Sequence, residues 1–320
     1  MICDLLKLEL CKILQSKRLL LVITVLLIIS LAGVRAEWNI AKSESAQMQM
    51  KLHYQEIERI ESNILRSESV RERSTDQEQA LKELRAEFQR LMDFELPKPK
   101  TPNAFSFAID RFGAAASELI LPILTLLIGS DLISDEFARG TIRLVFSSPM
   151  NRREFLAAKI LSGTLYVIGL VIVGRLIFIV TGGLAFGFTG WDEAVQGFPR
   201  LAGTTNGQFV LMDTGLKIFA MWVVLLMGIA FSVMLRTSIP ALVSSLAVVL
   251  SGGIFDAAYR RNDLSQLLKY LLPVHLDLAK PYLYFWIPWG PTFGIVVLSI
   301  YGIAFFLVIT LVFTRLEAPA

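Results

Sequence analysis

Six long apolar runs, separated by polar segments, dominate this chain of 320 residues. The hydrocarbon core of a bilayer is about 30 Å thick, so a helix needs roughly 20 mostly apolar residues to cross it. Runs near or above this length lie at 19–34, 114–133, 156–186, 215–235, 239–255 and 292–313. The pattern therefore predicts an all-α polytopic membrane protein with six transmembrane helices.

The first transmembrane helix is expected at 19–35. Its apolar run is short, but Lys17, Arg18 and Arg35 flank it, and their long side chains can reach the polar interface. The third run is longer than one crossing requires. We therefore expect that helix to tilt, or to end near the two glycines at 182–183.

Residues 1–18 form an amphipathic segment ahead of the first span. Apolar residues at 2, 6, 10, 13 and 14 share one helical face, opposite charged and polar residues. This pattern predicts an interfacial helix on the cytoplasmic side, with a solvated extension as the alternative. A cleaved signal peptide is the main alternative for the first span, but Asp4, Glu9 and the length of the preceding segment argue against it.

The polar block at 36–113 has the composition of a water-soluble insert. Apolar residues recur at heptad-like spacing over 50–64 and again over 81–91, with a polar stretch between the two runs. Three prolines over 97–102 then form a stiff spacer. We expect an extracellular helical hairpin with a Pro-rich linker, followed over 114–320 by the remaining five transmembrane helices.

The connection at 256–291 is more apolar than a free loop. Leucines follow helical spacing in its first half, and four prolines interrupt its second half. We expect an outer-leaflet re-entrant segment there. Such a segment can gate a path or plug the bundle, and the sequence does not decide between these roles.

The distribution of basic residues orients the chain. Lys and Arg gather in the segment before the first span and in the short loop between the second and third, as they do on the cytoplasmic side of membrane proteins. Trp38, Trp191, Trp286 and Trp289 fall at the opposite boundary, where indole rings prefer to lie. The connection at 256–291 also carries basic residues, so the rule is followed imperfectly. Both termini are expected in the cytoplasm, with the chain in a bacterial plasma membrane.

Composition supports the membrane assignment and narrows the partners. Hydrophobic residues make up 54% of the chain, charged residues only 18%, and the mean hydropathy is +0.58, which is too apolar for a soluble or a disordered protein. A net charge of +3 gives no reason to expect a nucleic-acid partner. Cys3 and Cys11 are eight residues apart, about 12 Å along a helix, and so cannot form a disulfide with one another.

The loop after the second span has the pattern of residues that is most informative about function. Glu136, Arg139 and Arg143 share one face of a predicted amphipathic helix at about 135–147. Pro149 ends this helix, because proline disfavours helical geometry in the residue before it. Asn151 and Glu154 then have capping-box spacing, so the third span is expected to begin there.

The run from Glu136 to Lys159 resembles the signature of type-2 ABC transporter permeases. In that family a glutamate, a Gly-Thr pair, a proline, one or two arginines and a lysine recur at this spacing after the second span. The six-span layout and the N-terminal helix are similar too, and the large insert after the first span resembles one subgroup of the family. The resemblance implies a permease dimer, in lipid, driven by two cytoplasmic ATPase subunits. It also implies ATPase-docking roles for Glu136, Arg139, Gly140, Thr141, Arg143, Pro149, Arg152 and Arg153.

A basic loop that binds anionic lipid is the alternative for this segment. Its residues would then interact with the membrane surface rather than with a protein.

Motifs for catalysis are missing from the sequence. There is no Gly-Lys dipeptide, so the chain cannot build a Walker A phosphate-binding loop, and ATP and Mg²⁺ are expected only in a partner subunit. His53 and His275 are the only histidines, and they form neither an HExxH zinc motif nor an evident metal site. The sequence also has no Gly-x-Ser-x-Gly elbow. We therefore expect no catalytic residue in this chain.

Arg175 is an ionisable residue within the third apolar run. It lies about 24 Å along a helix from Lys159, and a charge at such a position needs a partner or a water-filled cavity. Glu118, near the start of the second run, is the candidate partner. A structural ion pair and a place on the translocation path are both open for Arg175.

Two functions follow from these features. The first is the membrane-spanning permease subunit of an ABC transporter, an exporter, in which a separate subunit hydrolyses ATP. The second is a non-transporting membrane receptor or scaffold that uses its extracellular helical hairpin.

Overall fold

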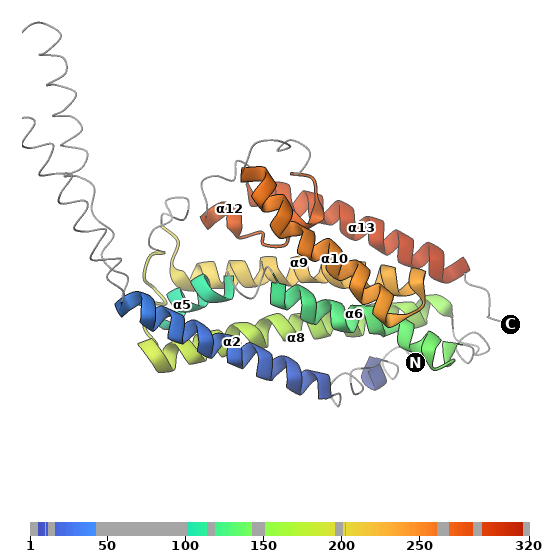
Figure 1. The fold of residues 1–320 in the computed structure, drawn as a ribbon, viewed down its shortest axis with the longest axis horizontal. Coiled ribbons are helices and arrows are strands. Elements are labelled where there is room, and N and C mark those ends of the chain that lie inside the picture. The colour runs from blue at the N-terminus through green and yellow to red at the C-terminus, as the bar shows by residue number, and fades with distance from the viewer. Residues whose placement is uncertain are drawn as a thin grey trace, which may run out of the picture. The chain divides into compact units, whose positions relative to one another are not determined.

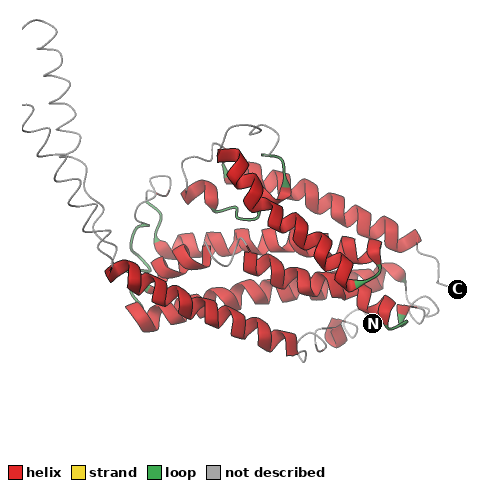
Figure 2. Ribbon diagram, in the orientation of Figure 1, coloured by secondary structure: helices red, strands yellow, loops and turns green. Residues whose placement is uncertain are grey.

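A computed structural model describes residues 6–9, 11, 17–42, 102–113, 119–142, 151–195, 201, 203–260, 269–283 and 290–315. Over these ranges the regular structure is helical, apart from one isolated bridge between Ala194 and Thr205 (Figure 2). The elements in chain order are α2 (Lys17–Lys42), α5 (Ala104–Arg111), α6 (Leu121–Ala138), α8 (Arg152–Phe186), α9 (Asn206–Leu235), α10 (Ser238–Arg260), η3 (Leu272–His275), α12 (Lys280–Leu283) and α13 (Pro291–Arg315).

The chain divides into two compact units. One comprises 1–32 and 103–320, and the other comprises 33–102. The heptad-like runs of the expected hairpin lie outside the described residues. The helical bundle of the first unit holds all the features discussed below.

The prediction of an all-helical, multi-pass membrane protein is confirmed. Within the described part of the chain, α8, α9, α13 and the Leu20–Asn39 part of α2 are long and apolar enough to cross a bilayer. The other two predicted runs correspond to α6 and α10. The first is 18 residues long and carries three acidic residues, while the apolar part of the second is only Ser238–Gly252. For these two helices, crossing the membrane stays a prediction.

Helix α9 lies at the centre of the bundle, and α6, α8, α10 and α13 all pack against it (Figure 1). Its first half is fixed by a capping box, in which the Thr205 hydroxyl accepts from the Gln208 amide and the Gln208 side chain accepts from the Thr205 amide. Its contact with α6 is closest at two glycines, where a Cβ on Gly228 would lie 3.3 Å from the backbone of Gly129. Small residues thus allow the two helix backbones to approach one another.

Helix α13 presents an apolar surface on the outside of the bundle. Large exposed side chains follow one another along it, at Val296, Ile300, Ile303, Phe306, Leu307 and Leu311. Such a surface is unfavourable in water and is ordinary against lipid tails. The same reasoning applies to the exposed leucines and isoleucines of α2.

Helix α8 runs unbroken through the glycines at 182–183, so the expected end at these glycines is not seen, and the alternative of a tilted helix stays a prediction. It ends instead at Gly187, where φ is +94°. A Cβ on Gly182 would lie 2.6 Å from the Phe107 ring, and one on Gly183 would lie 2.2 Å from the Phe188 ring. These two glycines therefore make room for aromatic rings and do not interrupt the helix.

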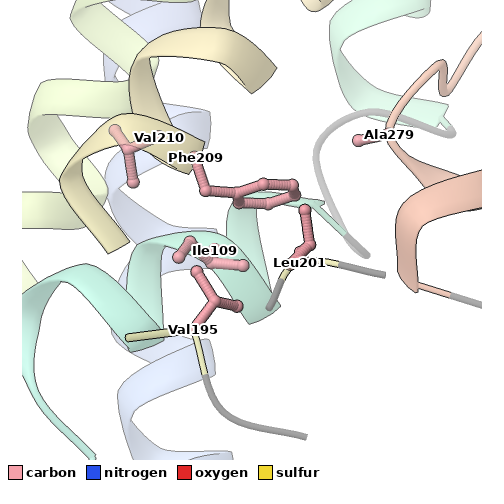
Figure 3. Packing of buried hydrophobic residues seen from close by; sticks show 6 residues of the cluster. All are labelled: Ile109, Val195, Leu201, Phe209, Val210 and Ala279. Carbon is pink, nitrogen blue, oxygen red and sulfur yellow. The ribbon is translucent and has the colours of Figure 1, made fainter. Parts of the chain in front are cut away.

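The boundary of the insert also differs from the prediction. Residues 103–113 were assigned to the extracellular block, yet α5 packs against α8 and α9 within the bundle. Asn103 and Ser106 form a capping box that begins this helix directly after Pro102. Its buried Ile109 joins Val195, Leu201, Phe209, Val210 and Ala279 in one apolar cluster (Figure 3). The prolines before it drew attention away from its short apolar face.

We expect Gly228→Val to lower the free energy of unfolding of the purified chain by about 1–3 kcal/mol, because the added side chain must separate α6 from α9. Gly169→Val is the matched control, since no atom lies within 4 Å of a Cβ at that position. Thermal unfolding in detergent measures both variants. Equal unfolding temperatures would contradict the close packing of the two helices.

Candidate functional site

Helix α6 ends in a glycine turn where a continuous amphipathic helix was expected. The last helical residue is Ala138, Arg139 is the C-cap, and Gly140 has φ +69°. The Gly140 amide donates to the Phe137 carbonyl at 3.1 Å, as in a glycine-terminated helix. Over 135–142, the described part of the helix predicted at about 135–147, a turn at 139–141 interrupts the helix, because the glycine redirects the chain. Arg143 and Pro149 lie outside the described residues.

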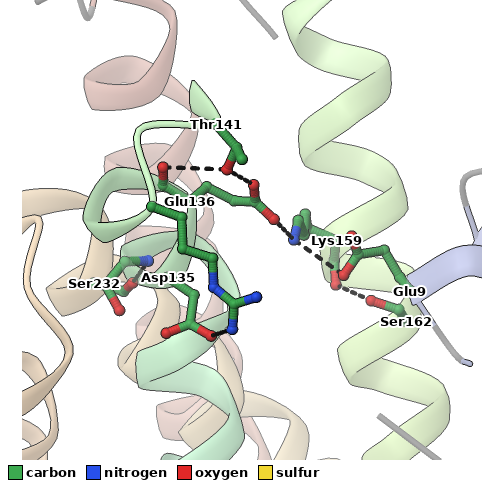
Figure 4. A network of polar contacts seen from close by, with 9 residues as sticks. Glu9, Asp135, Glu136, Thr141, Lys159, Ser162 and Ser232 are labelled. Atoms are coloured by element: carbon green, nitrogen blue, oxygen red, sulfur yellow. Dashed lines mark hydrogen bonds and ion pairs between the residues drawn. The ribbon is translucent and has the colours of Figure 1, made fainter. Parts of the chain in front are cut away.

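Glu136, near the end of α6, points toward Lys159 of α8 (Figure 4). It is buried, its carboxylate lies 2.8 Å from the Lys159 ammonium, and it also accepts from the Thr141 hydroxyl. Lys159 lies 3.0 Å from a carboxylate oxygen of Glu9, which is buried as well. One lysine therefore joins the N-terminal segment, the end of α6 and the start of α8. The structure assigns Glu136 and Thr141 to the internal support of the turn.

Several arginines are exposed among the described residues at this end of the bundle. The Arg139 side chain is 68% exposed, and its pair with Asp135 at 3.3 Å adds little stability at such an exposed position. Arg153 is exposed, and Arg152 is half-buried and donates to the Thr314 carbonyl at 3.4 Å. Arg236 is exposed beside α6, 5.9 Å from the Phe137 ring centroid. The glycine turn is therefore flanked by cations.

A second group of charges is buried farther along α8. Arg175 forms an ion pair with Asp213 of α9, and Lys217, one helical turn further on, pairs with the same carboxylate. Asp277, between η3 and α12, lies 3.7 Å from the Lys217 ammonium. All four side chains are at least nine-tenths buried. We call these residues the ionic cluster.

Helix α5 completes the surroundings of Arg175. The Arg175 guanidinium donates to the Ala108 carbonyl at 2.8 Å and lies 4.2 Å from the Phe112 ring centroid. The expected partner of Arg175, Glu118, lies outside the described residues, and the partner in the structure is Asp213. Sequence reasoning missed Asp213 because the fourth apolar run begins two residues later. The signal was available, since Asp213 and Lys217 are four residues apart and so share one helix face.

The segment at 269–283 closes over the ionic cluster. Leu272, Leu276, Leu278 and Ala279 are buried, and the segment packs against α10 and α13. His275 Nε2 lies 2.6 Å from the Lys269 carbonyl, and burial lowers the pKa of this imidazole below its ordinary value. The described part of the predicted re-entrant segment is therefore a packed structure of two short helices.

A metal site is not evident among the described residues, since no three His, Cys, Asp or Glu side chains are placed to share an ion. The two charged groups combine carboxylates with Lys or Arg, and these pair with one another. Both groups therefore serve to fix helices or to receive a charged molecule.

A comparison with protein families decides the class of the molecule. The model of the family described as ABC-2 family transporter protein matches residues 4–256. The chain belongs to this family. No curated protein matches the chain, so its assignment to a family rests on the match to the family model. This ABC-2 permease is thus a multi-pass membrane component of an ABC transporter, of the kind that works with an ATPase subunit.

We expect Asp213→Asn to destabilise the ABC-2 permease by about 3–5 kcal/mol, because it leaves two buried cations with Asp277 alone. Asp192→Asn is the matched control, since Asp192 is an exposed carboxylate in the segment after α8. The unfolding temperature and the yield of folded protein in detergent measure the effect. If the two variants behaved alike, the ionic cluster would have no structural role.

Proposed function

We propose that this chain is the permease subunit of an ABC exporter, and that a separate cytoplasmic ATPase drives it by pushing on the turn at the end of α6. The proposal rests on the ion pairs of Lys159 with Glu136 and Glu9. These pairs join the turn to the start of α8 and to the N-terminal segment. A push on the turn would therefore move α6 and α8 together.

The position and charge of the turn support a docking role. Arg139, next to Gly140 in the chain, and Arg153, at the start of α8, are both exposed, so an acidic groove on the partner would meet complementary charge. No atom of the described residues lies within 4 Å of a Cβ position at Gly140, which leaves room on that side for a partner to approach the backbone. Arg143, Pro149 and Arg152 belong to the same proposed contact by their resemblance to the family signature.

Export, a dimer of permeases and cytoplasmic termini are further parts of the proposal. They rest on the resemblance to type-2 ABC permeases and on the distribution of basic residues along the sequence. The exposed apolar faces of α2 and α13 provide surface for lipid and for a second permease.

Co-purification with the ATPase tests the docking site. When the chain is co-expressed with its ABC ATPase subunit, the two should purify together. Arg139→Glu and Gly140→Trp should each lower the amount of bound ATPase about tenfold or more. Arg139→Glu reverses a charge at the proposed contact, and Gly140→Trp places a large side chain where the partner would approach the backbone.

Arg35→Glu is the control for these variants, since Arg35 is an exposed arginine at the far end of α2. It should leave the complex intact. Undiminished ATPase binding by both test variants would show that the turn is not the docking site.

A further inference from the structure

Among the described residues, the ionic cluster is balanced by a residue from outside the long helices. Arg175, Asp213 and Lys217 lie on α8 and α9, and together they carry one net positive charge. Asp277, from the packed segment at 269–283, brings the sum to zero. A buried excess charge is costly, so the two helices require an anion at this place.

The Asp277 carboxylate lies farther from the Lys217 ammonium than the Asp213 carboxylate does. Its oxygen lies 3.7 Å from the Lys217 ammonium, which is within range of an ion pair but beyond hydrogen-bond length. The same carboxylate accepts from the Ala279 amide at 3.1 Å, within its own segment. Asp213, in contrast, is hydrogen-bonded to both cations. The weaker contact is the one that an incoming anion could replace.

The cluster also holds an unused hydrogen-bond donor. Within the described part of the chain, Nε of Arg175 is buried and has no acceptor. Buried donors are nearly always satisfied, so one without an acceptor indicates a missing partner. The guanidinium therefore has the capacity to bind one more oxygen.

We propose that Arg175 and Lys217 form an anion-binding subsite, which Asp277 occupies in the structure and an acidic group of the cargo occupies during transport. The inference rests on the proposed transport function and names its substrate class. Phe112 lies against the guanidinium, and Ile109 and Phe209 belong to an apolar cluster that includes Ala279, two residues beyond Asp277. The site therefore suits a phosphate or carboxylate attached to an apolar body.

Binding to the purified full-length chain, in nanodiscs of phosphatidylcholine and without ATPase, tests the subsite. The probes are decyl phosphate, inorganic phosphate and decanol. Asp277→Asn keeps the acceptor for the Ala279 amide but removes the competing charge. We expect it to bind decyl phosphate about tenfold more tightly than the unmodified chain and than Asp192→Asn.

Lys217→Gln should lose this binding, and the gain expected for Asp277→Asn keeps the test valid if Lys217→Gln does not fold. If inorganic phosphate binds as tightly as decyl phosphate, the subsite is supported and recognises the acidic group alone. If decyl phosphate binds more tightly, the subsite is supported and recognises an anionic amphiphile.

Two results would overturn the proposal. One is equal affinity of Asp277→Asn and Asp192→Asn for decyl phosphate. The other is equal affinity of Asp277→Asn for decanol and decyl phosphate. These measurements need no ATPase, so a negative result would not affect the docking proposal. Likewise, a negative co-purification result would not affect the proposed subsite.

Discussion

An ionised side chain inside an apolar helix bundle must be neutralised by another, and this constraint determines how the present permease is held together. Lys159 pairs with the carboxylates of Glu9 and Glu136, and Arg175 pairs with that of Asp213. In both cases the partners come from different segments of the chain. The same pairs that make burial of these charges tolerable therefore also fix which segments lie side by side.

Helix α8 connects the two ionic groups. Lys159 and Arg175 lie on it about 24 Å apart, at the rise of an α-helix, and no break separates them. At one end α8 is joined to the turn proposed to receive the ATPase, and at the other it is joined to α9. Asp277 extends this second group to the segment at 269–283. A continuous helix with fixed contacts at both ends is a simple way to carry a displacement between distant sites.

The sequence predicted the helices well, because membrane spans are determined by length and apolarity. All six apolar runs correspond to helices in the structure. Prediction from the sequence failed where the role of a residue depends on its contacts with other helices. The glycines at 182–183 receive aromatic rings, and Glu136 faces inward to Lys159. The Arg175–Asp213 pair could not be deduced, because periodicity along a chain does not tell which helices become neighbours.

If Lys159 transmits the action of the ATPase, the effect of nucleotide should reach the segment at 269–283. Tyr270, 51% exposed in that segment, is replaced by cysteine in a chain carrying Cys3→Ser and Cys11→Ser. Labelling by an impermeant maleimide is then followed in proteoliposomes that contain the ATPase, with and without ATP and vanadate. We predict a nucleotide-dependent labelling rate that Lys159→Gln abolishes and Arg35→Gln, an exposed control near the C-terminal end of α2, preserves. A rate indifferent to nucleotide, or one that responds equally in Lys159→Gln, would contradict the account.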